Sequence, residues 1–182
     1  MSIVITGNPG VGKHTISDKI AYKFGLSVID INSVAKDAGL FEENENSNDV
    51  DTDELKKILH DKISKNSLIV GHLAPYVLEK NQVKIMIILR RNPYDLLEVY
   101  RQRKYDSYKS KENAGSEVLG IIAHDAIGKF QEKAFQIVSS EKSIQEVIEK
   151  ITNVISSNQG YEEVDWLDLV TKNNDLKKFF DD

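Results

Sequence analysis

Short apolar runs alternate along the chain with stretches in which apolar residues recur at every third or fourth position. The runs lie at 2–6, 26–31, 67–70, 84–89 and 134–138 and predict strands. The runs 67–70 and 84–89 lack polar alternation, which predicts that these two strands are fully buried. The periodic stretches predict helices over 13–24, 51–65, 93–104, 112–132 and 143–157. Strands that alternate with helices need crossover connections, so the pattern predicts an α/β fold with a parallel, five-stranded sheet and helices on both faces.

Two stretches interrupt this alternation. Residues 42–53 are acidic and nearly free of apolar side chains, which predicts a mobile loop. Residues 156–160 have the composition of a linker. They separate a domain over 1–157 from an amphipathic tail over 158–182, which holds the only tryptophan of the chain, Trp166.

The composition is that of a single globular domain: of 182 residues, 40% are apolar and 29% are charged, and the mean hydropathy is -0.38. A net charge of -5 argues against a general polyanion binder, so no direct DNA binding is expected. The lack of cysteine excludes a disulfide framework and a thiolate metal site. Because apolar runs stay far below the roughly 18 residues of a membrane span and the first strand leaves no room for a signal peptide, we expect a cytoplasmic protein without a membrane partner.

The segment 7–15, Gly-Asn-Pro-Gly-Val-Gly-Lys-His-Thr, follows a predicted strand and opens a predicted helix. That context is required of a phosphate-binding loop, in which glycines let several backbone N–H groups turn toward one anion beside a helix N-terminus. Lys13 can reach the β- and γ-phosphates of a nucleotide. A chance glycine-rich turn would not combine this spacing, lysine and flanking elements. The predicted ATP contacts in the loop are Gly10, Val11, Gly12, Lys13, His14 and Thr15.

His14 departs from the usual motif, in which a serine or threonine after the lysine offers a hydroxyl to Mg²⁺. A non-hydroxyl residue before a threonine, here Thr15, resembles the loops of nucleoside monophosphate kinases, where Mg²⁺ is held largely through water and phosphate oxygens. His14 is then a neutral substitution. The alternative is that its imidazole ligates the metal. Thr15 and Asp30 are the other candidate protein ligands.

All four arginines of the chain fall within residues 90–103: Arg90, Arg91, Arg101 and Arg103. The planar guanidinium grips phosphate oxygens in a bidentate manner, and phosphoryl transfer needs positive charge over the transferring group. This concentration therefore predicts a phosphate clamp, with Arg91 and Arg101 as the expected bystanders. The alternative is a solvated helix end.

The strand ends are poor in acidic residues. The run 67–70 is followed by Gly71 and His72, and only the second strand supplies a carboxylate, Asp30. This argues against a motor-type ATPase with a base poised to activate water, and it fits a kinase, in which the acceptor supplies the nucleophile. His72 is either a buried structural residue or a contact to substrate or water.

With these residues together, the chain resembles the adenylate kinase isoenzyme 6 family, and most of all its archaeal members. The resemblance spans residues 3 to about 151. The matching features are the loop 7–15, the segment 29–35, His72, the pair Leu89-Arg90, the triplet Arg103-Lys104-Tyr105, the four-residue spacing of Tyr105, Lys109, Asn113 and Glu117, Lys142, and Val164-Asp165-Trp166 in the tail. The departures are His14, Val70 in place of an acid, and Lys36 in place of an arginine.

This resemblance implies a P-loop, nucleoside monophosphate kinase-like fold with strand order 2-3-1-4-5, and transfer of the γ-phosphoryl group from ATP to AMP with Mg²⁺, together with ATPase activity. It implies catalytic roles for Lys13, Arg90, Arg103 and His72, and further ATP contacts from Arg103 and Lys142. It implies AMP contacts from Asp30, Ser33 and Lys36, within a monophosphate-binding segment at about 30–50. It also implies a lid at about 102–113 that carries Tyr105 and Lys109. The lid would close over the reacting phosphates and exclude water.

The resemblance also implies a role in maturation of the small ribosomal subunit and its 16S rRNA, through contact with ribosomal protein uS11 and the pre-30S subunit. An acidic segment such as 42–53 would suit a basic ribosomal protein. Two other functions stay open. One is an assembly-factor ATPase switch with incidental kinase activity. The other is a small-molecule kinase of the shikimate or gluconate type, although such enzymes lack the spacing from Tyr105 to Glu117.

Overall fold

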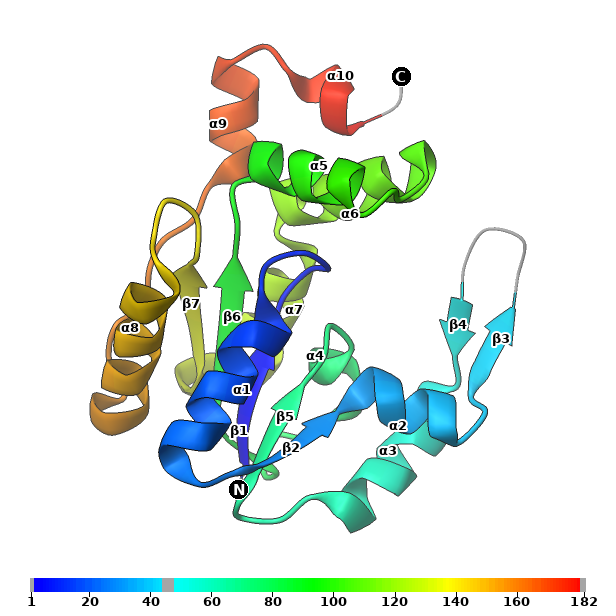
Figure 1. Cartoon of the computed structure of the whole chain (residues 1–182), viewed down its shortest axis with the longest axis vertical. Coiled ribbons are helices and arrows are strands. Elements are labelled where there is room, and N and C mark those ends of the chain that lie inside the picture. Colours follow the sequence, from blue (N-terminus) through cyan, green and yellow to red (C-terminus); the bar gives the residue numbers. More distant parts are fainter. Residues whose placement is uncertain (1, 44–47, 181–182) are drawn as a thin grey trace.

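The protein is described here by a computed structural model that covers residues 2–43 and 48–180 (Figure 1). Its centre is a five-stranded parallel sheet whose strands follow one another in the order β2 (Ser27–Asp30), β5 (Ser67–Val70), β1 (Ser2–Thr6), β6 (Val83–Arg90) and β7 (Ala134–Val138). Every neighbouring pair in this sheet is parallel. Counted along the sheet, the order is 2-3-1-4-5, which confirms the predicted fold class.

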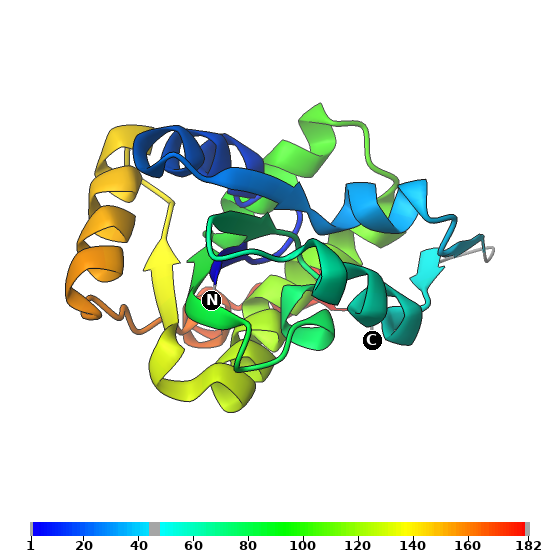
Figure 2. The same cartoon turned by 90° about the horizontal axis from the view of Figure 1, so that it is seen from below.

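Helices cover both faces of the sheet (Figure 2). The helices α1 (Lys13–Phe24) and α8 (Ile144–Ser157) lie on one face, and α3 (Thr52–Lys62), α4 (Ala74–Val77) and α7 (Ile121–Phe130) lie on the other. Two buried apolar clusters result, one beneath each helical layer. Successive strand residues point to opposite faces. All residues of β1 and β5 and all but Lys84 of β6 are buried, which explains why these strands show no polar alternation, whereas β2 at the edge of the sheet is only partly covered.

Helix ends coincide with capping residues in the sequence. The Asp51 side chain accepts hydrogen bonds from the first-turn N–H groups of Asp53 and Glu54 and so caps the start of α3. Pro93 is the first residue of α5 (Pro93–Gln102), directly after the capping Asn92. Local side-chain chemistry is therefore enough to set these boundaries.

The predicted single helix over 112–132 is wrong. The segment holds two helices, because α6 (Ser107–Leu119) ends at Gly120 and α7 begins after it. Gly120 has φ 64, a left-handed conformation that ends one helix and redirects the chain into the next. Helix α6 also begins earlier than predicted, because Asp106 caps it by accepting from the N–H of Lys109 at 2.8 Å.

The predicted loop over 42–53 is also wrong in part. After α2 (Ile31–Asp37), the strands β3 (Phe41–Glu43) and β4 (Asn48–Val50) pair antiparallel, and residues 44–47 of the predicted loop lie outside the described residues. Phe41 lies opposite Val50 at the base of this hairpin, and both pack against the core of the α3 layer. One apolar pair at the base is enough to dock a hairpin whose remaining residues are polar.

The tail packs beyond the carboxyl ends of the strands, over α5 and α6 (Figure 1). It forms α9 (Trp166–Lys172) and α10 (Leu176–Phe179), preceded by an extended segment in which the Glu162 N–H donates to the Gln136 carbonyl of β7 at 3.1 Å. A short 3-10 turn, Gln131–Lys133, leads into β7. Val170 and Phe179 of the tail are buried in the α1–α8 core. Within the described residues, no helix is both long and apolar enough to span a bilayer.

Candidate active site at the carboxyl edge of the sheet

The predicted phosphate loop joins the end of β1 to the start of α1. A Cβ at Gly7 would lie 2.3 Å from the Leu89 carbonyl oxygen of β6, so only glycine fits there. Gly12 has φ 97 and is the N-cap of α1, and no side chain of the described residues caps that helix start. The first-turn N–H groups of a helix lack intrahelical acceptors, so here they remain available to an anion.

Side chains hold the loop's carbonyl oxygens away from this opening. Four consecutive carbonyls accept hydrogen bonds, in the order Asn8, Pro9, Gly10 and Val11, from Lys13 Nζ (2.8 Å), Tyr100 Oη (2.6 Å), Arg91 Nη1 (3.2 Å) and Ser139 Oγ (3.2 Å). These partners hold the loop in one conformation. Pro9 has no N–H and the Val11 N–H donates to the Asn8 carbonyl at 3.5 Å, so the uncapped N-terminus of α1 is the part of the loop region best suited to bind phosphate oxygens.

Lys13 is buried, with 6% of its surface exposed, and its ammonium donates to the Asn8 carbonyl. Burial lowers the pKa of Lys13 to about 8, the nearby charges of Glu117 and Asp30 oppose that shift, and Arg103 adds to it. A buried ammonium with a weakened hold on its proton is stabilised by a bound phosphate. Lys13 is therefore mostly charged at pH 7, and a bound phosphate would favour its charged form further.

Asp30 connects the loop to the start of α2. Its Oδ1 accepts from the Ser33 N–H at 3.0 Å and so caps α2, and its Oδ2 lies 2.6 Å from His14 Nε2. The His14 ring is thus engaged with a carboxylate. The predicted AMP contacts Ser33 and Lys36 are both exposed on α2.

His72 lies just beyond β5 in the same electrostatic environment. Burial lowers the pKa of His72 to about 4, with further lowering by Lys13 and Lys109 and an opposing effect of Asp30. The imidazole is therefore neutral at pH 7 and can donate or accept one hydrogen bond without adding charge. The structure places His72 among the charged groups of the site rather than in the apolar core.

The predicted lid residues follow α5. Arg103 is exposed at the helix end, and Lys104, where the resembled family has glycine, adopts a left-handed φ of 56. Tyr105 then stacks on Tyr100 with ring centroids 5.4 Å apart. Lys109 is exposed in the first turn of α6. Arg103 is close enough to lower the pKa of Lys13, and Lys109 is close enough to lower the pKa of His72, so both charges lie near the site.

Two residues predicted to contact phosphate or nucleotide, Arg90 and Lys142, have hydrogen-bond partners within the protein. Arg90 is buried, and its Nε and Nη2 donate to the Oε1 and main-chain oxygen of Glu117, at 2.8 and 2.9 Å, while Nη1 donates to Gln136. All three guanidinium nitrogens therefore have protein acceptors, as in a structural ion pair. Lys142 donates to the Val138 carbonyl at 2.9 Å and lies 3.6 Å from Glu162.

The sequence reasoning missed three groups that shape the loop: the Asn8 side chain, Arg91 and Glu117. Arg91 was expected to be a bystander, but it binds the Gly10 carbonyl, and its buried Nε has no hydrogen-bond partner among the described residues. Arg101 is exposed and pairs with Glu98, as a bystander would. The available signal was the four-residue spacing that ends at Glu117, because it places a carboxylate on the inner face of α6.

Mg²⁺ prefers oxygen ligands and retains several waters when it binds with nucleotide phosphates. Among the described residues, no cluster of three or more acidic or histidine side chains is suited to a metal ion. Asp30 is the carboxylate beside the loop, and Thr15 offers an exposed hydroxyl one residue after His14. This donor set fits Mg²⁺ held mainly by phosphate oxygens and water. Asp30 and Thr15 would then interact with the metal ion through its bound waters.

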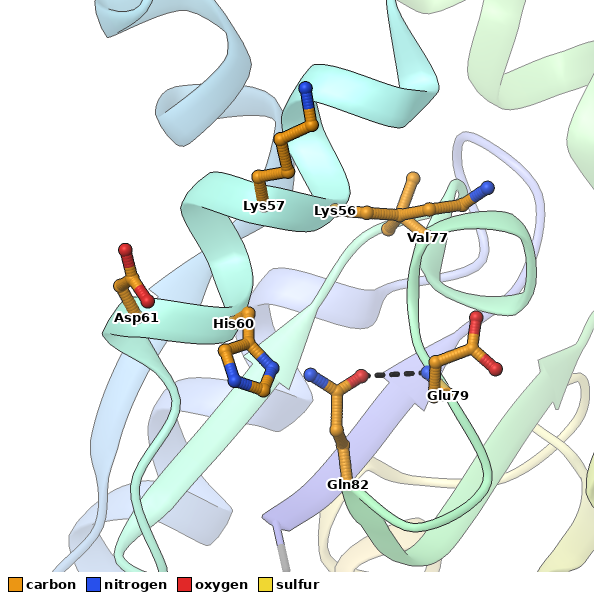
Figure 3. A pocket seen from close by; sticks show the side chains of 7 residues that line it. All are labelled: Lys56, Lys57, His60, Asp61, Val77, Glu79 and Gln82. Carbon is orange, nitrogen blue, oxygen red and sulfur yellow. Dashed lines mark hydrogen bonds between the residues drawn. The ribbon is translucent and has the colours of Figure 1, made fainter.

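A second hollow, of about 370 Å³, lies between α3 and the turn that leads into β6 (Figure 3). His60 faces Gln82 across it, and Gln82 Oε1 accepts from the Glu79 N–H at 2.7 Å. Its two lysines, Lys56 and Lys57, are paired with acids of their own helix. Because β6 begins here, the hollow lies at the amino edge of the sheet, opposite to the edge where α/β proteins bind ligands.

The parallel sheet in the order 2-3-1-4-5, with a phosphate loop between β1 and α1, defines a P-loop kinase. Two solved structures share the fold. One is shikimate kinase from Acinetobacter baumannii in complex with shikimate, with a TM-score of 0.57 and 21% sequence identity over 87% of this chain and 94% of that chain. The other is a gluconokinase from Sinorhizobium meliloti 1021, with a TM-score of 0.54 and 13% sequence identity over 81% of this chain and 87% of that chain. Residues 3–120 match the family described as "AAA domain", to which the chain belongs.

Closer relatives come from archaea. The chain is 33% identical over 156 residues to "Putative adenylate kinase" from Thermococcus kodakarensis, with 85% of each chain covered. It is 32% identical over 178 residues to the protein of the same name from Methanococcus maripaludis, with 92% of this chain and 96% of that one covered. The chain therefore belongs to the family of these archaeal proteins.

Proposed function

We propose that the protein transfers the γ-phosphoryl group of ATP to AMP. The observation that carries the proposal is the contact between His14 of the phosphate loop and Asp30 at the start of α2. This contact joins the loop that would hold ATP to the helix on which we propose that AMP binds. The names of the archaeal relatives favour AMP as the acceptor.

Lys13 and the loop N–H groups would hold the β- and γ-phosphates of ATP, and Mg²⁺ would neutralise charge between them. Arg103 and Lys109 would close over the transferring group from the turn above the loop. Closure would exclude water, which otherwise competes with AMP for the phosphoryl group. His72, neutral at pH 7, would orient the acceptor phosphate or a water by a hydrogen bond.

The acceptor is tested by measuring ADP formation from ATP and Mg²⁺ with AMP, CMP, GMP, shikimate or gluconate as the second substrate. We expect AMP to give the highest kcat/KM and to suppress the release of inorganic phosphate. The rate of the Lys13→Ala protein, measured in parallel, gives the activity of contaminating kinases, which is subtracted from every rate. Phosphate release that is unaffected by any nucleoside monophosphate would reject the AMP kinase and support an ATPase switch. Turnover with shikimate or gluconate would support a small-molecule kinase.

We also propose weak ATPase activity and a role in small ribosomal subunit maturation, with ribosomal protein uS11 as the first partner to test. The support is the acidic composition of residues 42–53, which suits a basic protein surface. Binding of purified uS11 should weaken as salt rises, because screening shortens the Debye length to about 10 Å at 0.1 M. A variant with the acids of this segment changed to Asn or Gln should bind less while keeping its AMP phosphorylation. Equal binding by both proteins would reject this segment as the contact, and no binding would reject the partner.

A further inference from the structure

A buried carboxylate on α6 joins three parts of the chain that are distant in sequence. Glu117 has 1% of its surface exposed and accepts hydrogen bonds from four donors outside its own helix. These donors are Asn8 Nδ2 (2.7 Å), Arg90 Nε (2.8 Å), the Arg91 N–H (3.0 Å) and Trp166 Nε1 (3.2 Å). A buried charge requires such compensation, and Arg90 alone neutralises it. The other three donors therefore have their positions set by Glu117.

The first of these donors belongs to the phosphate loop. Asn8 gives its amide to Glu117, its Oδ1 accepts from Ser116 Oγ at 3.2 Å, and its main-chain carbonyl accepts from Lys13. A nucleotide phosphate would draw Lys13 away from that carbonyl. The side-chain anchor on α6 would then be what keeps the first turn of the loop in place. Glu117 is thus connected to Lys13 through a single residue, Asn8.

The last donor belongs to the C-terminal tail. Trp166 opens α9, and the tail beyond it is fixed to α5: Tyr94 Oη donates to Asp175 at 3.0 Å, and the Tyr94 ring meets the buried Phe179 edge-on at 5.3 Å. The position of the Trp166 indole is therefore determined by the packing of the tail on the helices that carry the lid turn. Any displacement of the tail would reach Glu117 directly.

We propose that Glu117 is a positioning residue for the phosphate loop, and that the C-terminal tail, acting through the Trp166 N–H, sets the affinity of the loop for ATP. This goes beyond the proposed function, because it concerns the donor nucleotide and holds for any acceptor. It depends on the loop binding ATP. It does not depend on AMP being phosphorylated.

The first test replaces the indole while keeping an aromatic ring. Trp166→Phe should weaken ATP binding, measured by calorimetry, by about threefold or more, as expected for the loss of one hydrogen bond to a charged acceptor. The KM for the acceptor and the kcat at saturating ATP should change by less. Leu167→Ala, on the same helix and 41% exposed, is the matched control and should leave ATP affinity unchanged. A Trp166→Phe protein with lower thermal stability but unaltered ATP affinity would reduce Trp166 to a structural role and overturn the proposal.

The second test asks whether the effect passes through the loop. In an Asn8→Ala background, Trp166→Phe should have little further effect on ATP affinity, because its route to Lys13 is already broken. Full additivity of the two substitutions would overturn the proposed connection. This double-mutant cycle distinguishes an effect of Trp166 that passes through Asn8 from a general destabilisation of the fold.

The third test uses the unaltered protein, in which Trp166 is the only tryptophan. Titration with ATP and Mg²⁺ should change its fluorescence emission with the same Kd that calorimetry reports, and the change should be much smaller in Asn8→Ala at saturating ATP. Emission that stays constant while calorimetry shows binding would overturn the proposal. If AMP proves not to be the acceptor, ATP binding and the emission change should still be observed. Failure of the proposed AMP kinase activity can therefore be distinguished from failure of the proposed link between the tail and the loop.

Discussion

The proposed donor and acceptor sides of the site are built differently. On the donor side, the loop is buried, and the carbonyls of Asn8, Pro9, Gly10 and Val11 each have a side-chain partner. On the acceptor side, β2 is an edge strand, Ser33 and Lys36 of α2 are exposed, and the contact to the loop is made by His14, an exposed side chain. For the proposed function, this difference predicts a preformed donor site and an acceptor site whose specificity depends on closure around the bound substrate.

The largest expected effect comes from the centre of the donor side. Lys13→Ala should reduce phosphoryl transfer by on the order of 10²-fold or more, because it removes the positive charge closest to the transferring group. Circular dichroism and thermal unfolding should show that the fold is kept. Turnover close to that of the unaltered protein would mean that the loop does not hold the reacting phosphates.

Arg103→Lys tests whether the lid turn completes the donor side. The charge stays but the bidentate grip is lost, so kcat should fall by about tenfold or more while the Kd for ATP changes less. Arg101→Lys is the matched control, because Arg101 is exposed and pairs with Glu98. Equal and small effects of the two substitutions would place the clamp elsewhere.

The pH dependence of ATP binding probes the burial of Lys13. The pKa of Lys13 is lowered to about 8 in the free protein, and bound phosphate favours the charged form and raises it. Binding therefore takes up a proton above pH 8, so affinity should fall as pH rises through that value, by up to about tenfold per unit. Calorimetry between pH 7 and about 9.5 measures the slope, in a range where the phosphates are already ionised.

The control for this experiment is Lys13→Arg, in which the side chain stays protonated throughout the range. Its affinity for ATP should show no such fall with pH, whatever its absolute value. A slope that persists in Lys13→Arg would assign the titration to another group.

The smallest expected effect lies at the junction of the two halves. His14→Gly removes the partner of one Asp30 oxygen, but Asp30 keeps its cap to Ser33, and both His14 and its contact are exposed. Activity should change by less than about threefold, as for most surface contacts, and the Mg²⁺ dependence should persist. A loss of Mg²⁺-dependent activity would instead make His14 a metal ligand.

Much of the fold could be predicted from the sequence, because its signals are local. The helix Lys13–Phe24 and the strands Ser67–Val70 and Ala134–Val138 have the predicted bounds. The break at Gly120 was missed, since apolar periodicity continues across it and a glycine within a helical pattern is often tolerated. The hairpin of β3 and β4 was missed because its docking depends on one apolar pair, Phe41 and Val50.

The candidate site divides in the same way. The phosphate loop was recognised from nine consecutive residues because its chemistry, glycines and a lysine at fixed spacing, is contained within them. Arg90 was predicted to contact phosphate, but tertiary packing gives it Glu117 and Gln136 as partners. A guanidinium has the same chemistry in both roles, so residue type alone does not distinguish them.

The sequence by itself determined the parallel α/β architecture and the glycine-rich loop between the first strand and the first helix, because hydrophobic period and loop glycines act over a few neighbouring positions. Only the tertiary structure decided that Asn8 and Glu117, 109 positions apart, hold each other, and that the tail reaches the same carboxylate through Trp166. Such contacts leave no local pattern. They arise because burying one charge draws together donors from wherever the fold places them.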